Sequence, residues 1–291
     1  MIECRGLTHY YGSKLIYEDL SFGVPEGRIL GLLGKNGTGK TTTINILSGY
    51  LEPRGGQCLI FGEDIRHMRP RTRCDIALLL EGHVQYSFMT IGQIERFYSS
   101  FYPAWNADAY YELMAKLKVA PGQRISRMSC GQRSQVALGL ILAQNAKLLI
   151  LDDFSMGLDP GYRRLFVEYL RDYAKSEGKT VFLTSHIIQD MEKLVDDCII
   201  MDYGRILLQK PVDYILDNFR RYTFTVTGGA PIPRDAALYN TSAVGERTET
   251  YSFEPEEGVG RLLAEAGVEF SGLVSEKLNL EDAFIGLTGK Y

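Results

Sequence analysis

The sequence predicts an α/β protein built on a mostly parallel sheet. Segments rich in β-forming residues alternate with helical periodicity up to about residue 210. Three apolar runs, at residues 29–33, 147–151 and 180–184, are typical of buried strands. Helices are expected between them, one starting at Lys40 and one after Asp159, which precedes a proline as helix caps often do.

Length and composition set limits on the class of protein. The 291 residues allow one large domain and a small one, and 45% apolar and 23% charged residues are ordinary for a globular protein. A net charge of -4 and a pI near 5.7 provide no general attraction to nucleic acid, so we expect no nucleic-acid partner. We find no apolar run of membrane-helix length and no signal-peptide pattern at the N-terminus. We therefore expect a cytoplasmic protein with reduced cysteines that reaches a membrane only through a partner.

Residues 34–42, with the sequence GKNGTGKTT, fit the phosphate-binding pattern G-x-x-x-x-G-K-[ST] between a buried strand and a helix. Backbone N–H groups at such a helix start favour an anion, and glycine lets the backbone close around phosphates. We expect Lys40 to bind the β- and γ-phosphates and the Thr41 hydroxyl to ligate Mg²⁺. The nucleotide-binding residues expected in this loop are Gly34, Asn36, Gly37, Thr38, Gly39, Lys40, Thr41 and Thr42.

Two further segments depart from the alternating pattern. Residues 87–145 contain a possible capping box at Thr90 and Gln93 and a second helix near 109–118, so they are typical of a helical insertion. After about residue 212, two β-rich runs are followed by a helix near the end. The sequence thus predicts a nucleotide-binding domain at 1–212, with a helical subdomain at about 87–145, and a small α+β accessory domain at 213–291.

The apolar strand ahead of Asp152 and Asp153 ends in two carboxylates. A triphosphate site needs a carboxylate to hold Mg²⁺ and a polar group to orient the attacking water. We assign Asp152 to the metal and Asp153 to the water. An apolar strand that ends in aspartate is common in proteins. The assignment of these two residues therefore depends on the presence of the phosphate loop.

Residues 129–133, SCGQR, resemble the L-S-G-G-Q signature of the ATP-binding cassette (ABC) ATPases. The phosphate loop, this signature, the carboxylate strand, residues 157–159 and residues 184–186 follow the order of that family from about residue 1 to 210. Ser129 and Gln132 also form a capping box, so the signature opens a helix whose positive end can face an anion. The resemblance implies a P-loop NTPase fold of the ABC ATPase type.

The same resemblance implies a dimer of two cassettes, packed head to tail, with two ATP molecules in the interface. Each signature, through Ser129, Gly131 and Gln132, would then cover the γ-phosphate held by the other cassette. By the same comparison His186 contacts the γ-phosphate and Asp159 crosses the interface. Tyr11 matches the aromatic residue that stacks on adenine, although Tyr10 is a rival for that role.

Three positions differ from the family pattern. Glu81 stands where the family usually has glutamine; its carboxylate can still ligate Mg²⁺ and face the nucleotide. Cys130 replaces the first signature glycine. Asp153 stands where the family usually has the glutamate that polarises water, and its reach is shorter by about an ångström. Misplacement on that scale can cost roughly 10²-fold in rate, so slow hydrolysis is expected.

The resulting hypothesis is the ATP-hydrolysing subunit of an ABC transporter, with a second ATPase subunit and integral membrane permease subunits as partners. Residues 101–105 and 279–284 look like those of bacterial exporters with separate membrane subunits. The alternative is a cassette that binds ATP as a conformational switch and scarcely hydrolyses it. A chromosome ATPase with heptad arms is disfavoured because only 90 residues separate Gly39 from Ser129. A translation-type protein normally carries two cassettes, and this chain has one set of motifs.

Overall fold

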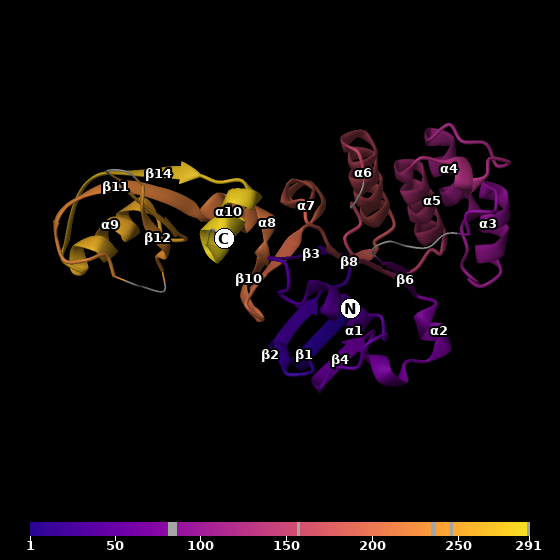
Figure 1. Ribbon diagram of the computed structural model, residues 1–291, viewed down its shortest axis with the longest axis horizontal. Coiled ribbons are helices and arrows are strands. Elements are labelled where there is room, and N and C mark those ends of the chain that lie inside the picture. Colours follow the sequence, from indigo (N-terminus) through magenta and orange to yellow (C-terminus); the bar gives the residue numbers. More distant parts are fainter. Residues whose placement is uncertain (81–85, 156–157, 234–236, 245–246, 290–291) are drawn as a thin grey trace. The chain divides into compact units, whose positions relative to one another are not determined.

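The computed structural model describes residues 1–80, 86–155, 158–233, 237–244 and 247–289, which form two compact units, Met1–Leu208 and Gln209–Tyr291 (Figure 1). The predicted α/β fold is confirmed by a six-stranded sheet in the order β10-β9-β3-β8-β7-β6, in which β3 pairs in parallel with β8 and β9, and β7 with β6 and β8. Its strands are β3 (Ile29–Gly34), β6 (Ile76–Leu79), β7 (Leu148–Leu151), β8 (Thr180–Thr184), β9 (Asp197–Asp202) and β10 (Arg205–Pro211).

The first unit also contains a second, antiparallel sheet, which the sequence analysis did not predict. Its order is β2-β1-β4-β5. The strands are β1 (Ile2–Tyr11), β2 (Lys14–Val24), β4 (Gly55–Ile60) and β5 (Glu63–Asp64). Cys4 pairs with Phe22 on one side and with Cys58 on the other. The hairpin of β1 and β2 closes through a tight turn and was not predicted. Cys4 of β1 and Cys58 of β4 are 54 positions apart, and pairing over that distance leaves no local sequence pattern.

Helix α1 (Lys40–Leu47) follows β3 through the phosphate loop and contacts both β3 and β4. Its Ile44, Ile46 and Leu47 are buried in a core that also contains residues of β1, β2 and β4 from the antiparallel sheet and of β3, β7, β8 and β9 from the parallel one. Burial of three aliphatic side chains contributes several kcal/mol, at about 1.5–3 kcal/mol for each. The helix behind the loop is therefore firmly anchored.

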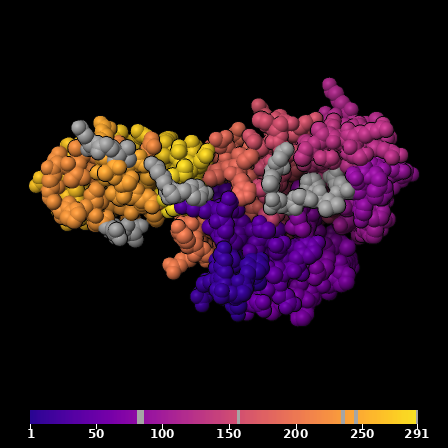
Figure 2. All heavy atoms as spheres, viewed as in Figure 1, coloured from indigo at the N-terminus to yellow at the C-terminus, as the bar shows by residue number. Residues whose placement is uncertain are grey.

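The short helix α2 (Pro70–Arg73) precedes β6. The helical block follows β6 and contains three main helices, α3 (Ile91–Ser99), α4 (Ala107–Lys116) and α5 (Cys130–Ala143). The capping box predicted at Thr90 and Gln93 is present at the start of α3. Gly139 of α5 lets α4 approach, since a Cβ there would come within 2.9 Å of the Tyr110 ring. In the space-filling view this block (magenta) and the N-terminal sheet (indigo) form one continuous body (Figure 2).

Helix α6 (Pro160–Ser176) packs beside α5, and α7 (Ile188–Leu194) packs against α6 and β3. The carboxylate of Asp159 caps α6 as predicted, accepting hydrogen bonds from the backbone N–H groups of Gly161 and Tyr162. Phe166 and Leu170 of α6 are fully buried. The start of α6 thus has a defined position relative to α5.

The second unit is built on an antiparallel sheet in the order β12-β13-β11-β14. Its elements are α8 (Val212–Asn218), β11 (Arg220–Gly229), β12 (Tyr239–Val244), β13 (Arg247–Ser252), α9 (Glu256–Glu265), β14 (Val268–Lys277) and α10 (Leu280–Thr288). Tyr222 and Phe224 of β11 share a core with Val259 and Leu263 of α9. Helix α10 contacts α8, β12 and β13, so helices pack on this sheet to complete a small α+β unit.

Candidate nucleotide-binding site

The phosphate loop leads from β3 into α1 through a backbone that only glycine adopts readily. Gly39 has φ +102°, and a Cβ at this position would come within 2.8 Å of the Tyr17 ring and of Ile16. The Thr38 hydroxyl donates a hydrogen bond of 2.9 Å to the Lys35 carbonyl and so closes the loop on itself. The sharp turn leaves the first N–H groups of α1 at the head of the helix, where an anion is favoured.

The ammonium group of Lys40 is folded over this loop. Its Nζ donates to the carbonyl oxygens of Gly34 at 2.6 Å and Lys35 at 3.0 Å, and the residue is 8% exposed. Burial lowers the pKa of Lys40 from its usual value, while the charges of Asp153 and Asp152 oppose that shift. The loop therefore holds a partly desolvated cation, which would attract a phosphate strongly, beside two carboxylates.

The two carboxylates at the end of β7 are organised by one hydroxyl from the neighbouring strand. Thr184 Oγ1 donates a hydrogen bond of 2.7 Å to Asp152 Oδ1 and accepts one of 2.9 Å from the Asp153 backbone N–H. All three residues are almost fully buried, and Thr184 is 2% exposed. The sequence analysis included Thr184 in the motif at residues 184–186 but did not predict its role in the site. The available signal was its position as a polar residue at the end of an apolar strand. Neighbouring parallel strands end at the same edge of a sheet, so a polar residue at the end of one strand lies within reach of a polar residue at the end of the next.

Asp153 and His186 lie against each other. The His186 backbone N–H donates to Asp153 Oδ1 at 3.3 Å, and His186 Nε2 lies 3.4 Å from Asp153 Oδ2. The histidine side chain is 53% exposed, whereas the aspartate side chain is 5% exposed. Asp153 also has φ +42°, a left-handed conformation that is uncommon outside glycine and is often found at functional sites. A strained, buried carboxylate is thus paired with an accessible imidazole.

A pocket of about 380 Å³ opens over the loop. Its lining residues are Tyr11, Lys14, Ile16, Asn36, Gly37, Gly39, Lys40, Thr41, Thr42 and His186. Six of the eight predicted loop residues, together with Tyr11 and His186, are therefore brought to one hollow, and Gly34 and Thr38 are not among the described residues of its lining. Lys14 and Ile16 were missed, although they follow Tyr11 at alternating positions around a tight turn, where β1 and β2 place Tyr11 opposite Lys14.

Tyr11 is 48% exposed and lines the pocket. Tyr10, the rival for base stacking, is not among the described residues of that lining, and its ring lies 5.7 Å from the Arg54 guanidinium. His9 packs edge-on against the Tyr11 ring with centroids 4.9 Å apart, and it is 2% exposed. Burial lowers the pKa of His9, so this imidazole supports Tyr11 as a neutral ring.

The signature residues and Asp159 are not among the described residues that line this pocket. Ser129 and Gln132 form the predicted capping box at the start of α5, with hydrogen bonds of 3.2 and 3.0 Å, and both are exposed or partly exposed. Glu81, expected at the nucleotide and metal site, lies outside the described residues. Within a single chain the phosphate loop and the signature are separate features.

The donors present suit Mg²⁺, which prefers hard oxygen ligands and keeps several waters. Thr41 is among the residues that line the pocket, and the Asp152 carboxylate is held by Thr184. No cluster of three or more carboxylate, histidine or cysteine side chains that could bind a metal by itself was found among the described residues.

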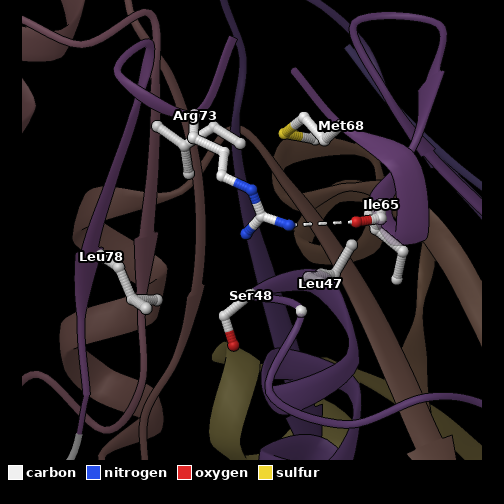
Figure 3. A pocket seen from close by; sticks show the side chains of 8 residues that line it. Leu47, Ser48, Ile65, Met68, Arg73 and Leu78 are labelled. Atoms are coloured by element: carbon white, nitrogen blue, oxygen red, sulfur yellow. Dashed lines mark hydrogen bonds between the residues drawn. The ribbon is translucent and has the colours of Figure 1, made fainter. Parts of the chain in front are cut away.

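A second, smaller hollow of about 140 Å³ lies at the other end of α1 (Figure 3). It is lined by Leu47, Ser48, Gly49, Ile65, Met68, Arg73, Ile76 and Leu78. The Arg73 guanidinium spans it and donates to the Ile65 carbonyl at 3.4 Å. None of the predicted nucleotide-binding residues lines it, and its mostly apolar walls do not suit a triphosphate.

Comparison with known proteins matches residues 17–155 to a family model described as ABC transporter. The Nod factor export ATP-binding protein I of Cupriavidus pinatubonensis is 29% identical over 304 residues, which cover 100% of this chain and 91% of that protein. The protein of the same name from Rhizobium meliloti strain 1021 is 29% identical over 301 residues, covering 99% and 88%.

Among solved structures, an ATP-binding subunit of an ABC transporter superposes with a TM-score of 0.65 at 26% identity, covering 75% of this chain and 92% of that one. A dimeric ATP-binding cassette in a post-hydrolysis state, bound to ADP and phosphate, gives a TM-score of 0.62 at 17% identity and covers 72% and 98%. The second likeness concerns the fold alone.

Proposed function

We propose that this chain, whose residues 17–155 match the ABC transporter family model, is the ATP-hydrolysing subunit of an exporter. The observation that carries the proposal is that the phosphate loop, Lys40 and His186 line one hollow. The buried carboxylates of Asp152 and Asp153 act on Lys40, and Asp153 lies against His186. No helix in the described ranges is long and apolar enough to cross a membrane. We propose that the permease is formed by separate chains, with this subunit on the cytoplasmic face of the membrane.

We propose that the triphosphate lies along the loop and the base against Tyr11. Lys40 would exchange its bonds to the loop carbonyls for bonds to the β- and γ-phosphate oxygens. Mg²⁺, held by Thr41 and Asp152, would supply a Lewis acid for the phosphate oxygens. Asp153 would orient the attacking water, and the exposed face of His186 would contact the γ-phosphate.

We further propose that two copies pack head to tail, so that each signature meets the other copy's nucleotide. Support comes from the position of Ser129, Gly131, Gln132 and Asp159 outside the pocket lining of their own chain. Ser129 and Cys130 at the start of α5 are exposed to solvent, as a site for a partner's phosphate would require. Residues 213–291, which carry none of these motifs, would form an accessory domain. The matches to export proteins do not favour a switch that scarcely hydrolyses ATP.

The test is ATP turnover by the purified full-length chain, together with its molar mass in solution measured with and without a non-hydrolysable ATP analogue and Mg²⁺. We expect magnesium-dependent release of phosphate and a shift from monomer to dimer with the analogue. A chain that binds no ATP would contradict the site, and a chain that turns ATP over as a monomer would contradict the shared interface.

Cys130 offers an independent probe of that interface. It is exposed, whereas Cys4, Cys58 and Cys198 are buried. Burial raises the pKa of the Cys198 thiol to about 12, and hydrogen bonding to Cys58 and burial raise the pKa of Cys4. We expect brief alkylation to label Cys130 faster than Cys58, and MgATP to protect Cys130 by closing the dimer over it.

Mass spectrometry of tryptic peptides reads this out. Cys74, which is partly exposed and lies outside the signature, is the internal control and should be labelled equally with and without nucleotide. Equal labelling of Cys130 in both conditions would show that nucleotide does not cover the signature.

A further inference from the structure

The ring of Tyr162, in the first turn of α6, lies directly on Gly131 of the signature. A Cβ at Gly131 would come within 2.5 Å of Tyr162 Cδ2 and 2.9 Å of its Cγ, distances that real Cβ atoms essentially never reach. Within this chain, then, the glycine is required by an aromatic ring behind it. That requirement is independent of any nucleotide.

A second contact joins the same two helix starts one turn further along α5. Gln135 is fully buried, and its Nε2 donates a hydrogen bond of 2.9 Å to the Tyr162 carbonyl. Gly131 and Gln135 are four residues apart and so lie on one face of α5. Tyr162 is therefore held to that face by its ring and by its backbone.

The third contact reaches Asp159. Its Oδ1 accepts hydrogen bonds from the N–H groups of Gly161 at 3.0 Å and Tyr162 at 3.1 Å. One residue, Tyr162, is thus bonded to Asp159 through its N–H, to Gln135 through its carbonyl and packed on Gly131 through its ring. The two segments assigned to the dimer interface meet at this residue.

We propose that Tyr162 is a positioning residue that locks the signature and Asp159 together, so that both face the partner's nucleotide as one rigid unit. The proposal rests on the dimer proposed above. Both segments then keep a fixed geometry without direct contact between their own side chains. Loss of the ring would leave the helices folded but would free the start of α5 to shift relative to Asp159.

A double-mutant cycle on Gly131 and Tyr162 tests the coupling in the full-length chain. The measured quantity is the dimer dissociation constant with a non-hydrolysable ATP analogue and Mg²⁺, alongside ATP turnover. We expect G131A to weaken the dimer about tenfold or more, because the methyl group displaces the ring. Y162A should weaken it similarly. The double variant G131A/Y162A should be no weaker than Y162A alone, within about twofold, because the methyl then meets no ring.

Tyr173 provides the matched control, since it lies on the same helix α6 and its hydroxyl donates to the Leu142 carbonyl at the far end of α5. Y173A should lower the melting temperature yet leave dimer affinity within about twofold of wild type. Y162F keeps the ring and should behave as wild type.

Additive losses in the cycle would mean that Gly131 is needed for approach to the partner's nucleotide and would overturn the proposal. Equal effects of Y162A and Y173A on dimerisation would also overturn it, because they would show that Tyr162 contributes only to the packing of α6 on α5. If G131A does not fold, the comparison of Y162A with Y162F and Y173A still shows whether loss of the Tyr162 ring specifically weakens the dimer. Failure of the wild-type chain to dimerise would instead refute the underlying dimer, which keeps the two failures distinct.

Discussion

Replacement of Lys40 by alanine is expected to lower ATP turnover by roughly 10²–10³-fold or more, the loss seen when one preorganised charge-stabilising group is removed. Lys40 is the cation that the loop holds inside the pocket, with its Nζ 2.6 Å from the Gly34 carbonyl and close to two carboxylates. Without it, the negative charge on the β- and γ-phosphates would face the carboxylates of Asp152 and Asp153 without the ammonium group that lies beside those carboxylates. We therefore expect weaker ATP binding as well as slower chemistry.

The measurement is phosphate release under saturating MgATP, combined with ATP affinity from nucleotide titration. Lys35→Ala is the matched control, because it removes a cation from the same loop that is not part of the pocket lining. It should retain most of the turnover. Equal melting temperatures for the two variants would show that the loop has not collapsed, and turnover of Lys40→Ala near wild type would refute the assignment of the site.

Features that depend on neighbours in the chain could be predicted from sequence. The capping boxes at Thr90 and Ser129 and the Asp159 cap each join groups two or three residues apart, so their hydrogen bonds are encoded locally. The phosphate loop was found for the same reason, since the turn from β3 into α1 requires glycine at defined spacing.

Features that depend on tertiary contact could not be predicted. The bridge from Thr184 to Asp152 joins residues 32 positions apart, and it exists only because β7 and β8 are neighbours. The contact of Tyr162 with Gly131 likewise needs α5 and α6 to be packed side by side. Periodicity identifies strands and helices but does not say which of them are neighbours. The residues that hold the motif residues in place can therefore be identified only in the folded structure.

Asp153 carries the second large prediction, because its carboxylate is assigned to orient the attacking water. Asp153→Asn removes the charge at almost constant size, and asparagine tolerates the observed φ of +42° about as well as aspartate. We expect turnover to fall by roughly 10²-fold or more, as for loss of a positioned general base. ATP binding should persist, so an ATP-bound dimer should accumulate. Asp202→Asn changes another buried carboxylate at the end of a strand of the same sheet and is the matched control.

Asp153→Glu tests whether the short reach of the aspartate limits the chemical step. The additional methylene should bring the carboxylate about an ångström closer to the phosphate site and raise turnover, with ATP affinity nearly unchanged. Phosphate release and nucleotide titration, measured with the membrane subunits where the full transporter can be assembled, separate these two quantities. If neither substitution changes turnover, Asp153 does not orient water and the low-hydrolysis switch gains support. If Asp153→Glu loses activity while Asp153→Asn also loses it, the residue assignment stands, and the contacts of Asp153 with Thr184 and His186 have shaped the site around the shorter side chain.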